Sequence, residues 1–561
     1  MIKDKFAKII VLLTCLVVVA IMLPLQDQSF TDDFAHAQSV RHLLATGQVK
    51  ISEWSAPTLI FPIIWGAAFS KIFGFSFTTL HLSIIVMLPI LAISMYLILR
   101  EFKVDPLRSL IITLFFISIP WIFQFTFTFM TDIPFLTLEL LTLLFYVKGF
   151  QTNASHYLVI GSVFASMAFL TRQTGIIFPL TAFFSALITQ KERQNTDWWK
   201  KPLLILTIPL VTLILYSFWY QNPDNKTIIQ IKYEEQVTIL IQNIVPFTAV
   251  SINSRLQTFS ILIHRLLDFI SQVMGLFFPI IFFFVLFNFK KLLLIFRNNR
   301  RLSTVILITV FIFYAIDILN FRQTYTIGFP LILYQYEEFF PIPWAHLWKF
   351  FVVFSVPIWV VLTVNIWKNS KKDLNNTSLF LILAGFGVFI MTIISYFSWE
   401  EYIISLLPFA ILLLASSTKE FKFSKKAAFV LSVFLILDSL QMAKLRYREE
   451  GFVWNKATEL IKSGIPYNLI DPDRNIAWYP WFSYENDAKL AIERAGGDKS
   501  KANVESETKS PIYFIATKRQ LQYIPQDLEK FKIEEFSINS LFVNSKIEVF
   551  KNPDGFTYID K

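Results

Sequence analysis

Long apolar runs separated by short polar segments recur along most of this chain. A helix needs roughly 20 apolar residues to cross about 30 Å of hydrocarbon, and it satisfies its own backbone hydrogen bonds there. Runs of this length predict about thirteen transmembrane helices. We expect them at residues 7–25, 78–99, 107–125, 131–147, 156–171, 174–190, 202–220, 266–288, 302–320, 349–367, 377–395, 401–417 and 427–442.

The composition supports the same fold class. The chain has 561 residues, of which 55% are hydrophobic and 16% charged, and it includes 61 Phe. Such a chain is too apolar for one soluble core, so the sequence predicts an α-helical polytopic membrane protein. The single cysteine, Cys15, lies in the first span, which excludes an intrachain disulfide.

Basic residues alternate between the two sides of the predicted membrane domain. Lys3, Lys5 and Lys8 precede the first span, and the loops on that side carry most of the other Lys and Arg before residue 443. Positive residues favour the cytoplasm, so we expect a cytoplasmic N-terminus in a plasma membrane and an extracytoplasmic C-terminus. The net charge of +10 follows from this bias, and without a clustered basic face it does not indicate nucleic-acid binding.

The predicted organisation has two parts. Residues 1–442 form the transmembrane domain, and residues 443–561, here called the tail, are polar and predict a small extracytoplasmic α/β domain. Within the tail, the expected helices are 455–463 and 485–495, and the expected strands are 511–517 and 541–550. The other long outer segments are 26–77, here called the first outer loop, 221–265 and 321–348.

Two adjacent carboxylates, Asp32 and Asp33, follow the first span directly. Charged groups at a membrane boundary cost stability, which makes them candidates for function. The residues after them predict a short interfacial helix that Gly47 ends. A second interfacial segment is expected at 55–75, interrupted by Pro57 and Pro62. The carboxylate pair would therefore lie at the water boundary, within reach of a lipid-borne and a soluble reactant.

Two further charged residues lie at the predicted outer ends of spans. Asp132 opens a span, where it is either a functional acid or an ordinary helix N-terminal residue. Arg172 lies in a tight connection between two spans, where it is either a phosphate ligand or an arginine reaching the interface.

Other candidate residues are acidic, aromatic or imidazole side chains on the same side. His36 and Asp32 are four residues apart, a spacing that suits either a divalent metal ion or an unremarkable surface histidine. Aromatic and acidic residues together suit carbohydrate binding, although interfacial anchoring explains the aromatics equally well. The outer segment 321–348 holds such a cluster, namely Arg322, Tyr334, Tyr336, Glu337, Glu338 and Trp344. Glu400 and Glu401 form another carboxylate pair at the outer end of a span.

The chain resembles the GT-C superfamily of membrane glycosyltransferases, and within it the dolichyl-phosphate-mannose protein mannosyltransferase and lipid A aminoarabinose transferase group. The resemblance rests on the acid pair after the first span and on the order of several later motifs. These are Leu43-Leu-Ala-Thr-Gly47, Ile72-Phe-Gly74-Phe-Ser76, Leu97-Ile-Leu-Arg100-Glu101, Met130-Thr-Asp132-Ile-Pro134, Phe169-Leu-Thr-Arg172 and Glu401-Tyr402-Ile-Ile-Ser-Leu-Leu-Pro408. The chain departs from the group at Asp33, often Glu there, at Ser55-Ala-Pro57 in place of His-Pro-Pro, and at Glu401 in place of a basic residue.

The resemblance implies transfer of a sugar from a polyprenyl-phosphate-linked donor to an acceptor on the outer face, with inversion at the anomeric carbon. That chemistry needs a base for the acceptor hydroxyl and compensation of the phosphate charge. The implied catalytic acids are Asp32, Asp33 and Asp132, with Arg172 and Arg322 at the donor phosphate. The implied acceptor or sugar ligands are His36, Glu337, Glu338, Glu400 and Glu401, and a divalent metal ion is possible.

Two other classes of protein share these sequence features. A transporter or flippase of lipid-linked saccharides would also have many spans, intramembrane charges and amphipathic outer segments. It would not need an acid pair in the first outer loop or a soluble tail. A non-catalytic scaffold that binds a glycan through the tail is the third reading.

Overall fold

The computed structural model describes most of the chain. The described ranges are 3–23, 26–56, 58–188, 199–245, 251–279, 376–395, 400–417, 424–472, 475–504, 511–517, 528–539 and 544–556, with scattered positions between 281 and 361. The predicted spans 302–320 and 349–367 and the predicted outer segment 321–348 fall almost entirely outside the described residues.

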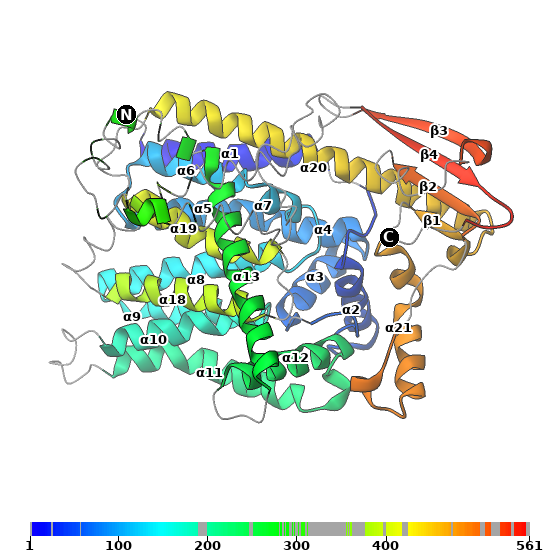
Figure 1. Cartoon of the computed structure of the whole chain (residues 1–561), viewed down its shortest axis with the longest axis horizontal. Helices are drawn as coiled ribbons and strands as arrows, with labels where there is room; N and C mark the ends of the chain where they lie inside the picture. The colour runs from blue at the N-terminus through cyan, green and yellow to red at the C-terminus, as the bar shows by residue number, and fades with distance from the viewer. Residues whose placement is uncertain are drawn as a thin grey trace.

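Six helical segments in the described part of the chain are long and apolar enough to cross a membrane. Shorter apolar helices lie between them, and the spans run roughly parallel in Figure 1. The six are α1 (Asp4–Met22), the pair α4 (Phe77–Ile85) and α5 (Met87–Glu101), α8 (Asp132–Thr152), α11 (Lys200–Tyr220), α18 (Asn376–Ile394) and α20 (Lys425–Lys462).

The remaining described helices fill the bundle or cap its ends. They are α2 (Asp33–Thr46), α3 (Ile60–Phe73), α6 (Pro106–Ile117), α7 (Pro120–Phe125), α9 (Ser155–Phe169), α10 (Ile177–Ile188), α12 (Ile228–Ile244), α13 (Ile252–Leu276), α19 (Leu407–Ser417) and α21 (Trp478–Arg494). The 3-10 turns are η1 (Gln173–Ile176), η3 (Pro223–Asn225), η4 (Glu400–Leu406), η5 (Tyr467–Leu469), η6 (Lys499–Lys501) and η7 (Leu528–Phe531).

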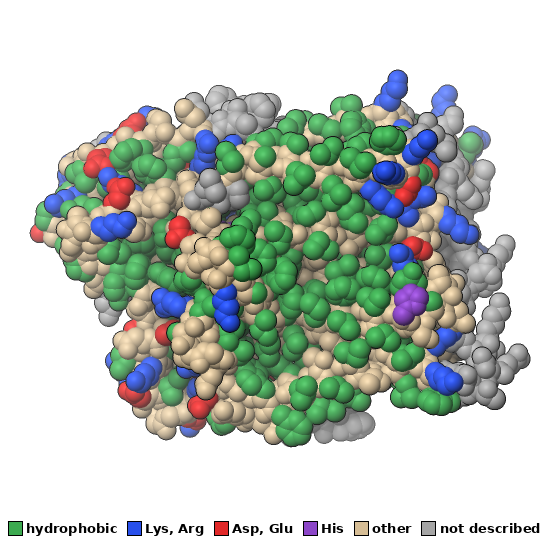
Figure 2. All heavy atoms as spheres, turned by 180° about the vertical axis from the view of Figure 1, so that it is seen from behind, with side chains coloured by type: hydrophobic (Ala, Val, Ile, Leu, Met, Phe, Trp, Pro, Cys, Tyr) green, Lys and Arg blue, Asp and Glu red, His purple; other side chains and the backbone are tan. Residues whose placement is uncertain are grey.

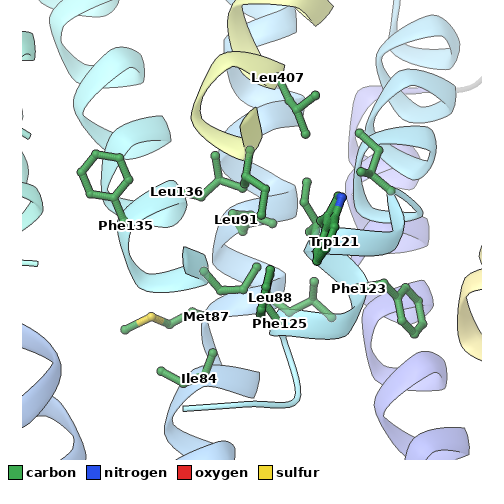
Figure 3. Packing of buried hydrophobic residues seen from close by; sticks show 14 of the residues in the cluster. Ile84, Met87, Leu88, Leu91, Trp121, Phe123, Phe125, Phe135, Leu136 and Leu407 are labelled. Carbon is green, nitrogen blue, oxygen red and sulfur yellow. The ribbon is translucent and has the colours of Figure 1, made fainter. Parts of the chain in front are cut away.

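The surface of the protein supports a membrane-embedded bundle. Figure 2 shows a broad band of hydrophobic side chains across the molecule, with charged side chains concentrated beyond both of its edges. In the interior, side chains of α4, α5, α7, α8 and α19 meet in one apolar core (Figure 3). Apolar side chains therefore cover the outside of the bundle and also fill its core, as expected of a protein that is surrounded by the hydrocarbon of a membrane.

Ion pairs link helix ends on one side of the bundle. Arg100 of α5 contacts Asp4 of α1 with 2.9 Å between Nε and Oδ1, and Lys148 of α8 lies 3.7 Å from Glu101. Lys425, at the start of α20, also reaches the connection between α5 and α6. The N-terminus and these three helix ends thus share one side, in agreement with the alternation of basic residues.

Several predicted spans differ from the helices in detail. The span at 107–125 is two helices, because Pro120 lacks the backbone N–H needed to continue α6 and instead begins α7. Pro62 does not interrupt α3, because it lies in the first turn, where its missing N–H has no helical acceptor. The span predicted at 266–288 starts earlier, in α13, which crosses the direction of the spans steeply (Figure 1).

The tail contains a small sheet joined directly to the last span. Helix α20 continues without a break from 425 to 462, so the helix expected at 455–463 is its own C-terminal end. The sheet has the strand order β1-β2-β4-β3, with β1 parallel to β2 and the other pairs antiparallel. Its strands are β1 (Ile470–Pro472), β2 (Tyr513–Thr517), β3 (Lys532–Asn539) and β4 (Asn544–Lys551). The sheet, α2 and α21 gather at the end of the molecule opposite the N-terminus (Figure 1).

Candidate active site

The site forms where α2 begins. The predicted interfacial helix is α2, and Gly47 ends it in the left-handed conformation at φ 73°, which glycine adopts without a steric penalty. The residue before the acid pair, Thr31, also has a positive φ of 46°. Such a value is an outlier for a β-branched residue, so the surrounding contacts hold this turn in a strained shape.

Asp33 is fully buried and its carboxylate is well supplied with donors. The backbone N–H of Phe30 donates to its Oδ1 over 2.7 Å, and the Ser29 hydroxyl donates to the same atom. Its Oδ2 lies 3.0 Å from Nε2 of the buried His81 on α4. These contacts tie the segment before α2 to α4.

Asp32 differs from Asp33 in exposure and partners. It is half-buried and accepts one hydrogen bond, 2.9 Å long, from the indole Nε1 of Trp54. Desolvation raises the pKa of this carboxyl, with smaller contributions from the charges of Asp33 and Asp132, whereas Trp54 and His36 act in the opposite direction. A carboxylate that is reachable and weakly stabilised in its charged form suits a general base.

His36 lies one turn further along α2 and is 3% exposed, so the surface-histidine interpretation is wrong. Its Nδ1 lies 3.0 Å from the carbonyl oxygen of Phe129. Burial lowers the pKa of His36, although the charges of Asp32, Asp33 and Asp132 oppose that shift. Within the described part of the chain, no three His, Cys, Asp or Glu side chains lie close enough together to hold a metal ion.

Arg172 and Asp132 form an ion pair beside this cluster. One terminal guanidinium nitrogen of Arg172 donates to Asp132 Oδ1 over 2.8 Å, and Nε donates to the Thr131 hydroxyl over 2.8 Å. The guanidinium also lies 5.5 Å from the ring centroid of Tyr402 in η4. The Asp132 side chain is fully buried and its Oδ2 has no hydrogen-bond partner among the described residues. Asp132 is therefore the first residue of α8, as one of its two interpretations predicts, and it also pairs with Arg172, whereas its role as a functional acid stays a prediction.

The backbone around Arg172 is fastened to the segment before α3. The N–H of Phe61 donates to Leu170 over 3.0 Å, and the Gln173 side chain donates to the carbonyl of Ala56 over 2.9 Å. Gly175 packs so closely on the backbone of Ala168 and Phe169 that a Cβ would overlap it. This close approach allows the chain to turn back within η1 and hold Arg172 at the edge of the site.

Several residues of the site escaped the sequence analysis. Their partners come from distant parts of the chain, so no local pattern identifies them. Trp54 immediately precedes the predicted interfacial segment 55–75, and His81 lies inside the predicted span 78–99. The others are Glu53, Tyr484 and Lys499.

Five predicted site residues cannot be placed. The backbone of Glu400 and Glu401 opens η4, but their side chains lie outside the described residues, as do Arg322, Glu337 and Glu338 entirely. The structure thus brings together Asp32, Asp33, His36, Asp132 and Arg172.

Part of the chain is similar to a known protein family. Residues 56–220 match the family described as dolichyl-phosphate-mannose-protein mannosyltransferase. No curated protein matches the chain significantly.

Among solved structures, the chain is similar to ArnT from Cupriavidus metallidurans bound to undecaprenyl phosphate. The superposed region covers 96% of this chain and 97% of the ArnT chain, with a TM-score of 0.50 and 11% sequence identity. This likeness shows the fold. The S. cerevisiae protein O-mannosyltransferase Pmt1-Pmt2 complex bound to the sugar donor covers 40% of this chain and 34% of its own, with a TM-score of 0.34 and 14% identity. The second likeness is too low to carry an argument.

Proposed function

We propose that this protein, whose residues 56–220 match the dolichyl-phosphate-mannose-protein mannosyltransferase family, transfers a sugar from a polyprenyl-phosphate-linked donor to a hydroxyl-bearing acceptor. The observation that carries the proposal is the half-buried, singly hydrogen-bonded Asp32 beside the Arg172–Asp132 pair. The Asp32 carboxylate is suited to accept a proton, and the Arg172 guanidinium is suited to bind a phosphate.

The proposed reaction is a displacement at the anomeric carbon. Asp32 takes the proton of the acceptor hydroxyl, whose oxygen forms the new bond to the anomeric carbon. The bond from that carbon to the phosphate oxygen breaks, and its electron pair leaves with polyprenyl phosphate. Arg172 compensates the charge on the phosphate, and attack opposite the leaving group inverts the anomeric centre.

The remaining residues take supporting roles in this proposal. Asp33 orients Asp32, Asp132 orients Arg172, and His36 contributes to the acceptor or sugar side. Arg322, Glu337, Glu338, Glu400 and Glu401 stay candidates for the donor and acceptor contacts assigned to them from the sequence.

The proposal includes the membrane topology. We place the N-terminus in the cytoplasm, about thirteen spans in the plasma membrane, and the active site and tail on the outer face. The clustering of Asp4, Arg100, Lys148 and Lys425 at the opposite end of the bundle supports this orientation.

The test is an assay of donor cleavage. Purified protein in lipid is incubated with a panel of radiolabelled polyprenyl-phosphate sugars and candidate acceptors, and release of free polyprenyl phosphate is measured. We expect release by the wild type and a loss of at least about 100-fold in D32N, because a positioned general base contributes about 10²–10⁴-fold. The matched control is D27N, since Asp27 is exposed and only caps the start of α4 through the N–H of Thr78.

Two outcomes would contradict the proposal. Release that persists in D32N would remove Asp32 from the mechanism. Intact binding of the lipids without release, for every sugar and acceptor in the panel, would favour the transporter or flippase alternative.

A further inference from the structure

Trp54 connects the candidate general base to the tail. Its indole N–H donates to Asp32, while its ring packs between two other aromatic rings. The ring centroid of Phe34, on α2, lies 5.6 Å away, and that of Tyr484, on α21 of the tail, lies 5.0 Å away in an edge-on arrangement. Tyr484 is 2% exposed, so its ring is held inside the structure where it contacts Trp54.

The tail is held in this place by polar contacts on both sides of Trp54. The Ser52 hydroxyl donates to Glu485 over 2.6 Å, and the Gln38 side chain donates to the backbone carbonyl of Pro480 over 3.1 Å. Lys499 forms an ion pair with Glu53, with 2.6 Å between Nζ and Oε1. These contacts fix the position of α21 relative to the first outer loop.

We propose that Trp54 and Tyr484 are positioning residues for Asp32, so that the tail takes part in the reaction by holding the indole N–H against the candidate base. This inference rests on the proposed function. Edge-on aromatic contacts are favourable beyond the area that they bury, so the Tyr484 ring favours one orientation of the half-buried Trp54 ring.

The direction of the expected effect follows from the charges around Asp32. Four neighbouring groups affect the pKa of its carboxyl. Trp54 and His36 lower this pKa, and Asp33 and Asp132 raise it. Asp132 is also the ion-pair partner of Arg172. Trp54 is the neutral donor among them, and its hydrogen bond stabilises the ionised form that accepts a proton. Loss of that bond raises the pKa of Asp32, so the base becomes protonated at a higher pH.

The experiment measures the pH profile of donor cleavage for four variants of the full-length protein in lipid. W54F keeps an aromatic ring and removes the donor. We expect its acidic limb to move up by about one pH unit, because one hydrogen bond to a charged group is worth about that much. We expect its KM for the donor to stay near that of the wild type.

The tail is tested by two substitutions at one position and a control. Y484A should lower kcat about 10-fold and move the acidic limb in the same direction as W54F, because a 1 Å misplacement already costs up to about 100-fold. Y484F keeps the edge-on ring and should restore both values. F482A is the matched control, since Phe482 is on the same helix but packs on Tyr467 and Trp478 of the tail and is 42% exposed.

The outcomes separate this inference from the proposed function. Unchanged pH profiles in W54F and Y484A, with D32N inactive, would overturn the inference alone. Equal losses in Y484A and F482A would show that the tail contributes only to stability, which also overturns it. Full activity of D32N would overturn the proposed function itself.

Discussion

Asp32 and Asp33 are neighbours in the chain, but their carboxylates have different surroundings. Asp33 is fully buried and accepts hydrogen bonds from Ser29 and Phe30 besides its contact with His81. Asp32 is half-buried and accepts one bond from Trp54. The two side chains thus differ in burial and in the donors that stabilise their charge, which supports the different roles that we propose for them.

This difference predicts opposite effects of the same substitution. D33N removes the charge that the buried donors and His81 stabilise, and should lower the free energy of unfolding by on the order of 3 kcal/mol. D32N relieves a carboxylate that burial disfavours, and should leave the thermal midpoint unchanged or slightly higher. Thermal unfolding of both variants in the same detergent is the measurement, and a larger loss in D32N than in D33N would contradict the assignment.

At the scale of elements, the short connection between α9 and α10 decides where Arg172 lies. The chain turns within η1, and Gly175 approaches the end of α9 too closely for a side chain. Contacts from Ala56 and Phe61 then fasten the turn to the first outer loop. The position of the Arg172 guanidinium therefore depends on backbone packing as well as on its ion pair with Asp132.

The substitution G175A tests this dependence. A methyl group at this position overlaps backbone atoms, and overpacking of this kind typically costs about 1–3 kcal/mol. We expect a lower thermal midpoint and a higher KM for the lipid donor, because the displaced turn moves Arg172. The control is G47A at the end of α2, where a Cβ meets no atom within 4 Å and the cost comes only from its positive φ. A normal donor KM in G175A would separate the turn from donor binding.

At the scale of the whole molecule, contacts from several parts of the tail join it to the membrane part. Helix α20 carries the chain from one to the other, and its Tyr447 hydroxyl donates to the carbonyl of Gln26 just before the acid pair. Further along the chain, Lys499 meets Glu53 of the first outer loop. Burial raises the pKa of Glu53, and the ammonium group of Lys499 opposes that shift.

A double-mutant cycle measures the coupling of the tail to the first outer loop. K499M leaves the Glu53 carboxylate buried without its partner, and should destabilise the protein by about 3 kcal/mol. The double variant E53Q/K499M removes both charges and should lose clearly less stability than the sum of the single variants. Thermal unfolding together with limited proteolysis of the tail reports the result. Strict additivity would mean that this pair does not hold the tail in place.

The sequence alone determined the membrane class, most of the described spans and the place of the acid pair. These follow from local rules, because hydrocarbon forces each span to satisfy its own backbone and glycine ends α2 where a positive φ is needed. The confirmed spans include α1, α8, α11 and α18, each close to its predicted range. The predicted C-terminal end of the last span was wrong, and the break at Pro120 was not predicted, because apolarity indicates depth in the membrane and not where a helix stops.

Only the tertiary structure decided what surrounds each charge. Trp54 and His81 reach the acid pair from a loop and a span, and Tyr484 of the tail contacts Trp54. Their sequence separations leave no periodic signal. The same holds for Arg172, whose partner Asp132 lies 40 residues away and was assigned a role by itself. Burial and hydrogen bonding set the chemical character of a carboxylate, and both depend on segments that meet only after the chain has folded.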